Sequence, residues 1–128
     1  MAVVTLHSAS YPAVPAAVSD ARHAVERAAA AAGVAADVVS RVAIAVSEAA
    51  TNAVVHAYAD RPPGTLSVAA VLDGQLIVTV ADDGPGVRPR ADSPGIGLGL
   101  ALIGRLSDGL SIDDRPTGGA LVTMRFQV

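Results

Sequence analysis

The fold of this chain depends on one stretch, Val42-Ala43-Ile44-Ala45-Val46-Ser47-Glu48-Ala49-Ala50-Thr51-Asn52-Ala53-Val54-Val55-His56. Its small aliphatic residues predict a helix, and Glu48, Asn52 and His56 are four apart, so they form one stripe along it. An acid, an amide and an imidazole at the rim of a packed helix could act on a ligand, whereas the alternative interpretation is a solvated helix edge. A separate apolar arc predicts the core face: Val39, Val42, Ala43, Val46, Ala49, Ala50, Ala53 and Ala57.

The composition predicts a single domain over residues 1–128, large enough for a proper core. Apolar residues make up 52% of the chain, but with one Phe, two Tyr and no Trp the core must consist of small aliphatic side chains. The net charge of -3 argues against nucleic acid or an anionic membrane as the main partner. Without cysteine there is no disulfide framework and no thiolate metal site.

Two further features that the sequence lacks reduce the number of possible function classes. No apolar run looks long enough to span a bilayer and the N-terminus lacks a signal-like pattern, so we expect a cytoplasmic protein. All nine basic residues are Arg, which excludes a P-loop and a Schiff-base enzyme, since both need Lys. Any phosphate site must therefore use backbone N–H groups, Arg or a metal.

The periodicity along the chain predicts the element order βααββαββ. Residues 11–15 contain two prolines and are interpreted as a connection, and residues 60–64 are interpreted as a breaker between a helix and a strand. Together the elements predict a two-layer α/β sandwich, with helices on one face of a mostly antiparallel mixed sheet. The expected elements are a strand at 3–6, helices at 16–32 and 37–58, strands at 65–72 and 76–80, a helix at 95–107, and strands at 110–112 and 120–128.

Two glycine-rich segments carry candidate binding residues. Gly95, Gly97 and Gly99 lead into a helix, whose free N–H groups and dipole suit a phosphate, although such turns are also common without a ligand. Asp82 ends a strand and precedes Gly84 and Gly86. It is either the cap of a tight turn or a carboxylate that accepts a hydrogen bond from an exocyclic amine.

In combination, these motifs resemble the GHKL ATPase superfamily, which includes gyrase-type and histidine-kinase nucleotide sites. Ser47-Glu48-Ala49-Ala50-Thr51-Asn52-Ala53 is similar to its helix box, Asp82-Asp83-Gly84-Pro85-Gly86 to its first glycine box, and Gly97-Leu98-Gly99-Leu100 to its second. The likeness runs from about Val3 to Phe126 and implies the Bergerat-type ATP-binding fold. Within the superfamily, the chain most resembles small anti-sigma-factor serine/threonine kinases of the sporulation and general-stress type.

The resemblance implies ATP and Mg²⁺ as cofactors and assigns a role to each motif. Asn52 is the metal ligand, and Glu48 is the catalytic residue that orients or deprotonates the attacking hydroxyl. Asp82 binds the adenine amino group, with Gly84 and Gly86 making room for the base. The remaining candidates are expected to contact the phosphates or to lie at the edge of the site: His56, Arg88, Gly95, Gly97, Leu98 and Gly99.

The chain departs from the family pattern in two places. The segment that corresponds to the ATP lid, residues 88–94, is very short, and Ala120 stands where the family often has Thr. Both departures bear on turnover more than on binding. The alternatives are therefore a nucleotide-responsive binding module of the same fold with little kinase activity, or a stand-alone histidine-kinase-like catalytic domain.

The same resemblance predicts the partners. They are a sigma factor and an anti-sigma-factor antagonist, which is the substrate whose Ser or Thr is phosphorylated. It also implies a homodimer. No direct contact with nucleic acid or membrane is expected.

Overall fold

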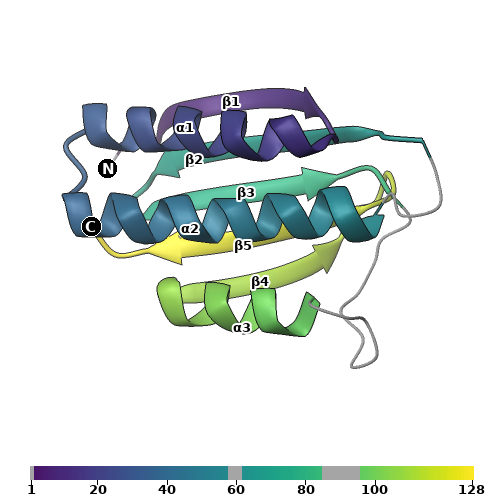
Figure 1. Cartoon of the computed structure of the whole chain (residues 1–128). Coiled ribbons are helices and arrows are strands. Elements are labelled where there is room, and N and C mark those ends of the chain that lie inside the picture. Colours follow the sequence, from purple (N-terminus) through teal and green to yellow (C-terminus); the bar gives the residue numbers. More distant parts are fainter. Residues whose placement is uncertain (1, 58–61, 85–95) are drawn as a thin grey trace.

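The computed structural model describes residues 2–57, 62–84 and 96–128, with the backbone alone described at 56–57 and 96–98. Figure 1 shows two layers, a five-stranded sheet and the helices that pack on it. The elements are β1 (Val4–Pro12), α1 (Pro15–Ala31), α2 (Ala36–Asn52), the π-helical turn η1 (Ala53–Ala57), β2 (Thr65–Leu72), β3 (Leu76–Asp82), α3 (Ile96–Leu106), β4 (Gly109–Asp114) and β5 (Ala120–Phe126).

The sheet has the strand order β1-β2-β3-β5-β4, and each of its four pairings is antiparallel. This confirms the predicted α/β sandwich and corrects the sheet from mixed to antiparallel. Alternate residues of each strand point to opposite faces. The apolar set that faces the helices is buried: Leu66, Val68, Ala70, Leu76, Val78, Val80, Met124 and Phe126.

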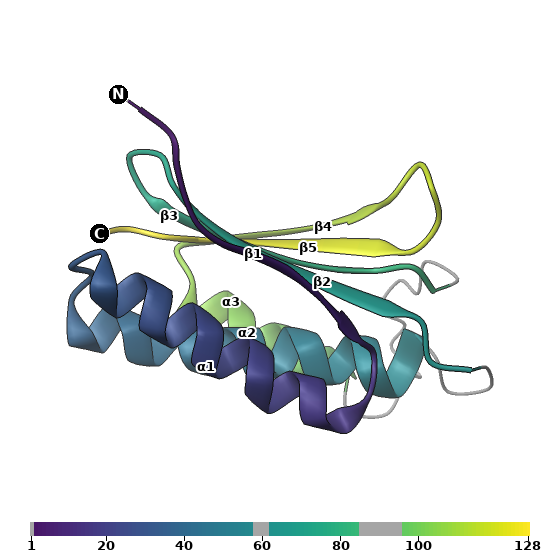
Figure 2. The same ribbon diagram turned by 90° about the horizontal axis from the view of Figure 1, so that it is seen from above.

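All three helices lie on one face of the sheet (Figure 2). The second helix, α2, lies between α1 and α3, so it is buried on more sides than the predicted apolar arc allowed (Figure 1). Val38 and Ala45 are buried in addition to most of the predicted arc, namely Val42, Ala43, Val46, Ala49, Ala50 and Ala53. Val39 is only partly buried, and the side chain of Ala57 lies outside the described residues. Ala45 is 0% exposed, because the middle helix of a three-helix layer has no solvated back at that position.

One helix among the described residues, Ala36–Val55, is apolar enough by length and composition to cross a membrane. This corrects the expectation that no apolar run has that length. The core helix of a soluble domain passes the same test, and seven residues of α2 are buried in this core. The segment is therefore weak evidence for a membrane span.

The first strand is longer than its sequence predicts. β1 runs to Pro12 and contains Tyr11, which was interpreted as part of a connection. It pairs with β2 from Val4 to Pro12, with a shift in register between Thr5 and His7. β1 lies at the edge of the sheet. A proline is tolerated at the end of such a strand, because its missing N–H removes no hydrogen bond from the sheet. The next proline, Pro15, begins α1, where its missing N–H is not needed.

Candidate functional site

The candidate site lies at one end of the two layers. α2 and β3 finish at this end, and α3 and β5 begin there (Figure 1). Three of the sequence motifs therefore meet although they are far apart in the chain. This arrangement follows from the antiparallel β3–β5 pairing together with an α3 that runs back along α2.

Glu48 and Asn52 lie one turn apart on α2, and both are partly buried. The Nδ2 atom of Asn52 is buried and has no hydrogen-bond partner among the described residues. A buried amide nitrogen without a partner costs stability, and such a group commonly indicates a missing ligand or water. The unpartnered Nδ2 atom favours a binding position on α2 over a solvated helix edge.

The first turn of α3 lies against this pair. A Cβ atom placed on Gly99 would be 3.1 Å from Asn52 Nδ2, 3.3 Å from Asn52 Oδ1 and 3.2 Å from Glu48 Oε2. Contacts of this length are tighter than most real Cβ contacts, so the close approach depends on residue 99 being glycine. The helix box and the second glycine box are thus side by side.

Asp82, the last residue of β3, is 7% exposed. Its Oδ1 atom accepts hydrogen bonds from the backbone N–H of Gly84 at 2.9 Å and of Ala120 at 3.4 Å. Burial raises the pKa of the carboxyl group and the neighbouring Asp83 adds to this, while both hydrogen bonds and Arg115 act to lower it. In the described part of the chain Oδ2 accepts no hydrogen bond, which leaves it available to a donor on a ligand.

The loop after β3 is tied to the neighbouring strand. Asp83 Oδ1 accepts the backbone N–H of Thr65 at 2.9 Å, and Gly84 is buried. Gly86, Arg88 and Gly95 lie outside the described residues, so their predicted contacts remain predictions. At Gly97 and Leu98 only the backbone, in the first turn of α3, is described.

The position of His56 differs from the sequence prediction in one respect. The α-helix ends at Asn52, and η1 continues as a π-helix through His56. A π-turn contains more residues than an α-turn, so spacing by four no longer keeps residue 56 in line with Asn52. The stripe is therefore described for Glu48 and Asn52 only, and the role of His56 stays a prediction.

Sequence reasoning missed Arg115, which lies in the turn between β4 and β5. Its Nη1 atom donates to the main-chain carbonyl of Asp82 at 2.7 Å. The segment that contains it was interpreted only as a turn, because Arg-Pro-Thr-Gly-Gly shows no link to a residue 33 positions earlier. Arg115 and Asp82 are neighbours only because β5 lies beside β3 in the sheet.

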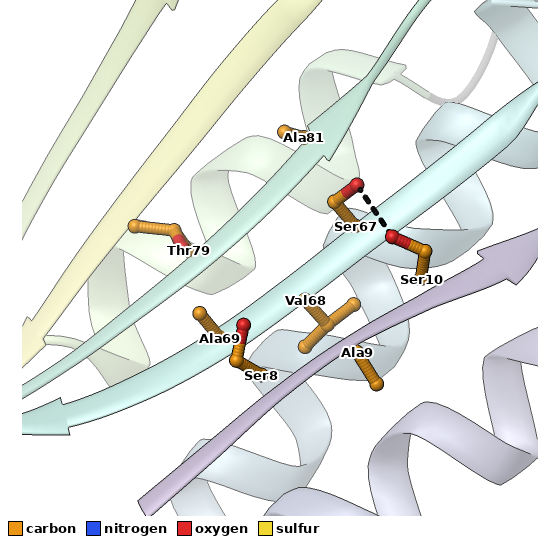
Figure 3. A pocket seen from close by; sticks show the side chains of 8 residues that line it. All are labelled: Ser8, Ala9, Ser10, Ser67, Val68, Ala69, Thr79 and Ala81. Carbon is orange, nitrogen blue, oxygen red and sulfur yellow. Dashed lines mark hydrogen bonds between the residues drawn. The ribbon is translucent and has the colours of Figure 1, made fainter. Parts of the chain in front are cut away.

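A cavity of about 360 Å³ lies on the sheet at β1, β2 and β3 (Figure 3). Its polar groups are hydroxyls, and the Oγ atoms of Ser10 and Ser67 are 3.4 Å apart. No charged side chain lines it, so it offers neither a general base nor a cation for a phosphate. A second cavity of about 260 Å³, beside the end of α2, is lined by Pro15, Val18, Thr51, Val54 and Val55 and is largely apolar.

The described residues contain no cluster of three His, Cys, Asp or Glu side chains that could hold a metal ion by themselves. An amide oxygen of Asn52 suits Mg²⁺, a hard cation that commonly takes one or two protein ligands and completes its shell with water and phosphate oxygens. The unpartnered Nδ2 atom of Asn52 is a hydrogen-bond donor and fits a phosphate oxygen, and the Oδ1 atom of the same side chain could ligate Mg²⁺.

Comparison with known proteins gives consistent results. The chain is 40% identical over 82 residues to Blue-light-activated histidine kinase 2 of Erythrobacter litoralis (strain HTCC2594), an overlap of 62% of this chain and 24% of that protein. It is 29% identical over 93 residues to the anti-sigma F factor of Heyndrickxia coagulans, covering 62% of this chain and 63% of that one. It is 30% identical over 92 residues to the anti-sigma F factor of Caldanaerobacter subterraneus subsp. tengcongensis, covering 62% and 64%.

Among solved structures, the chain is similar to the histidine kinase domain from the Erythrobacter litoralis EL346 blue-light activated histidine kinase. The TM-score is 0.60 at 27% identity, covering 83% of this chain and 60% of that one. The chain thus spans less than two thirds of each of these four relatives.

The family match is the broadest of these findings. Residues 11–126 match the family described as histidine kinase-like ATPase domain, so ATP is the nucleotide of the family. This stretch contains all three motifs, and the predicted likeness to GHKL ATPases and anti-sigma F factors is confirmed. The chain belongs to the histidine kinase-like ATPase domain family.

Proposed function

We propose that this chain is an anti-sigma factor that also acts as an ATP-dependent serine/threonine kinase on an anti-sigma-factor antagonist. The observation that carries the proposal is the contact of Gly99 with both Glu48 and Asn52. It brings a carboxylate, an amide and a helix N-terminus into one place. The likeness to anti-sigma F factors supports the choice of partners.

In this proposal Asp82 recognises the base. Its Oδ1 atom is occupied by two backbone N–H groups, so Oδ2 accepts the adenine amino group. A guanine base presents a carbonyl oxygen at the same position, and two acceptors repel each other. Gly84 and Gly86 leave room for the ring, and the protein therefore prefers ATP to GTP.

The residues that would hold the phosphates and Mg²⁺ are on α3 and at the end of α2. Asn52 binds the metal, and the N-terminal turn of α3 binds phosphate oxygens through its free N–H groups, as helix N-termini do. ATP bound with Mg²⁺ supplies the electrophilic phosphoryl group. We assign further contacts at the rim of this site to the remaining predicted residues, which are His56, Arg88, Gly95, Gly97 and Leu98.

Glu48 acts on the incoming hydroxyl group in this proposal. A carboxylate repels the negatively charged phosphate, so its useful place is beside the neutral nucleophile. There it accepts the proton of a partner Ser or Thr, or orients the hydroxyl for attack. Glu48 is only partly buried, which lets a protein substrate reach it.

Two further features belong to the proposal. The protein acts in the cytoplasm, where its sigma factor and antagonist are found. It forms a homodimer, which the molar mass of the purified protein in solution tests directly.

A second candidate function is a catalytic domain of a histidine kinase. It is favoured by the 40% identity to a blue-light-activated histidine kinase and by the structural likeness to a histidine kinase domain. The same nucleotide site would then deliver phosphate to a His. In a third alternative, ATP controls partner binding without phosphate transfer, as the short lid segment suggests.

Single-turnover transfer from labelled ATP separates these functions. Purified protein is mixed with an anti-sigma-factor antagonist and, separately, with a histidine phosphoacceptor domain. Acid-stable phosphate on the antagonist supports the serine/threonine kinase, and acid-labile phosphate on the acceptor domain supports the histidine kinase. Tight ATP binding with no transfer to either protein supports the binding module.

The variant Glu48→Ala tests the catalytic assignment. ATP affinity should stay within a few-fold, while transfer falls by about 10²–10⁴, the usual loss on removing a positioned base. Glu26→Ala on α1 is the matched control, since Glu26 forms only a half-exposed pair with Arg22 at 3.5 Å. A fully active Glu48→Ala protein would refute the role of Glu48.

A further inference from the structure

The turn between β4 and β5 holds itself in a fixed shape. The backbone N–H of Arg115 donates to the carbonyl of Gly119 at 2.9 Å, and the N–H of Gly118 donates to the carbonyl of Arg115 at 3.0 Å. Both glycines have positive φ, +99° at Gly118 and +94° at Gly119. The Arg115 side chain therefore extends from a closed, well-defined loop, and it is partly buried.

This turn and the first residue of β5 together contact Asp82 in three ways. Arg115 Nη1 donates to the main-chain carbonyl of Asp82 at 2.7 Å. Gly119 packs so closely on the backbone that a Cβ on it would overlap the same carbonyl group. The N–H of Ala120 donates to the carboxylate Oδ1 at 3.4 Å.

The strand register shows which hydrogen bond the Arg115 side chain replaces. β3 and β5 pair as far as Ala81 with Leu121, and one further step would pair Asp82 with Ala120. Asp82 and Ala120 do not form this regular ladder pair. The N–H of Ala120 is directed to the carboxylate of Asp82 instead, and the Arg115 guanidinium donates to the carbonyl.

We infer that Arg115 is a positioning residue for base recognition, which fixes the Asp82 carboxylate in the orientation that accepts the amino group of adenine. The inference rests on the proposed function, in which Asp82 binds that amino group. Without the guanidinium, Ala120 N–H can return to the carbonyl of Asp82 and complete the ladder. The carboxylate then loses one of its two hydrogen bonds and turns.

Charge supports the same role. Among the described residues, the charged groups that act on the Asp82 carboxylate are Asp83, which raises its pKa, and Arg115, which lowers it. A guanidinium ion next to a buried carboxylate favours the ionised form, and that form is the better acceptor of an amino hydrogen. Arg115 thus acts on Asp82 through geometry first and charge second.

The test compares ATP with its 6-deamino analogue, purine riboside triphosphate, by calorimetry on parent, Arg115→Met and Arg115→Lys proteins. Arg115→Met keeps the apolar stem and removes the charge and donors. We expect ATP affinity to fall about tenfold and the affinity for the analogue to stay within about twofold, so that discrimination is lost. Arg115→Lys keeps a charge and a donor and should restore most of the discrimination.

Two comparisons keep the result specific. Arg125→Met on β5 is the matched control and should leave both affinities unchanged, because no hydrogen bond of its side chain joins it to Asp82 in the described residues. In an Asp82→Asn background, Arg115→Met should add little, since both changes act on one interaction. A purely structural role would instead lower both affinities and the melting temperature together.

The outcomes distinguish the inference from the proposed function. A parent protein that binds ATP and the analogue equally would refute base recognition by Asp82. A parent that discriminates and an Arg115→Met protein that still discriminates would overturn the role of Arg115 alone. If Arg115→Met does not fold, Arg115→Gln takes its place, and the same two results decide. Equal loss of discrimination in Arg115→Lys and Arg115→Met would also contradict the inference.

Discussion

Gly99 of α3 lies so close to the Asn52 side chain of α2 that a methyl group on Gly99 would stand 3.1 Å from Asn52 Nδ2. The glycine therefore sets the separation of the two helices at the candidate phosphate end. Its role is steric, because Gly99 lies inside a regular helix and has no positive φ. Within the described ranges, the Nδ2 atom of Asn52 beside this glycine has no hydrogen-bond partner.

Gly99→Ala should lower the affinity for Mg²⁺–ATP while leaving the stability of the fold nearly unchanged. The added methyl group improves helix propensity by up to about 1 kcal/mol, but it pushes on Asn52 and Glu48. We expect a melting temperature close to that of the parent and a Mg²⁺–ATP affinity lower by about tenfold. Gly104→Ala on the same helix has no atom within 4 Å of the new methyl group and serves as the control. It should raise stability and leave ATP affinity unchanged, and a similar effect of both variants would contradict the steric role of Gly99.

Asp82→Asn should weaken ATP binding without weakening the fold. The Asn side chain keeps an Oδ1 acceptor for Gly84 and Ala120 but exchanges a charge-assisted acceptor for a neutral amide. The expected loss of ATP binding free energy is about 1.5–3 kcal/mol, with preference over GTP reduced. Calorimetry with both nucleotides measures it. At neutral pH the melting temperature should not fall, because burial disfavours the charge that the substitution removes.

The raised pKa of Asp82 predicts a pH dependence with a defined sign. In the folded state the carboxyl group holds its proton to a higher pH than in the unfolded chain, so its contribution to stability is present below the unfolded pKa and is lost as pH rises through the folded pKa. ATP binding needs the ionised form and changes in the opposite direction, strengthening as pH rises through the same interval. The ratio of parent to Asp82→Asn affinities, measured from acid to neutral pH, removes the titration of ATP itself. A ratio that does not change with pH would count against Asp82 as the acceptor.

Gly119→Ala should destabilise the fold more than Gly33→Ala. Both glycines have positive φ, +94° and +87°, so an alanine carries a backbone cost of about 1–2 kcal/mol at either position. A Cβ at Gly33 meets nothing within 4 Å, whereas at Gly119 it overlaps the Asp82 backbone. Chemical denaturation of the two variants gives the difference, which isolates the cost of moving the β4–β5 turn away from Asp82. Equal destabilisation would show that the turn is not held against Asp82.

The sequence predicted those parts of the fold that have a clear period. Leu66, Val68 and Ala70 alternate and are buried in a strand, and Val42 and Val46 lie on the buried side of the predicted helix. β1 was underpredicted because it is an edge strand in which polar residues such as His7, Ser8 and Ser10 hide the alternation. Edge strands face more solvent, so burial leaves a weaker pattern in their composition.

The candidate site was predictable only where its residues share an element. Glu48 and Asn52 were paired correctly because four-residue spacing on an α-helix is a local rule. His56 was placed by the same rule, but the π-turn after Asn52 changes the spacing. Arg115 had no local signal at all, since its contact with Asp82 exists only because β5 lies beside β3.

The dependence of Asp82 on Arg115 and Ala120 has a consequence for the time at which the site forms. These contacts join residues 33 and 38 positions apart, and they require β5 to have inserted between β3 and β4. A nascent chain that has reached only α3 contains Glu48, Asn52 and Gly99, but its Asp82 carboxylate lacks these partners. In the proposed mode of base recognition, specific nucleotide binding therefore begins only after β5 has been synthesised and paired, and the ligand stabilises a domain that is already assembled.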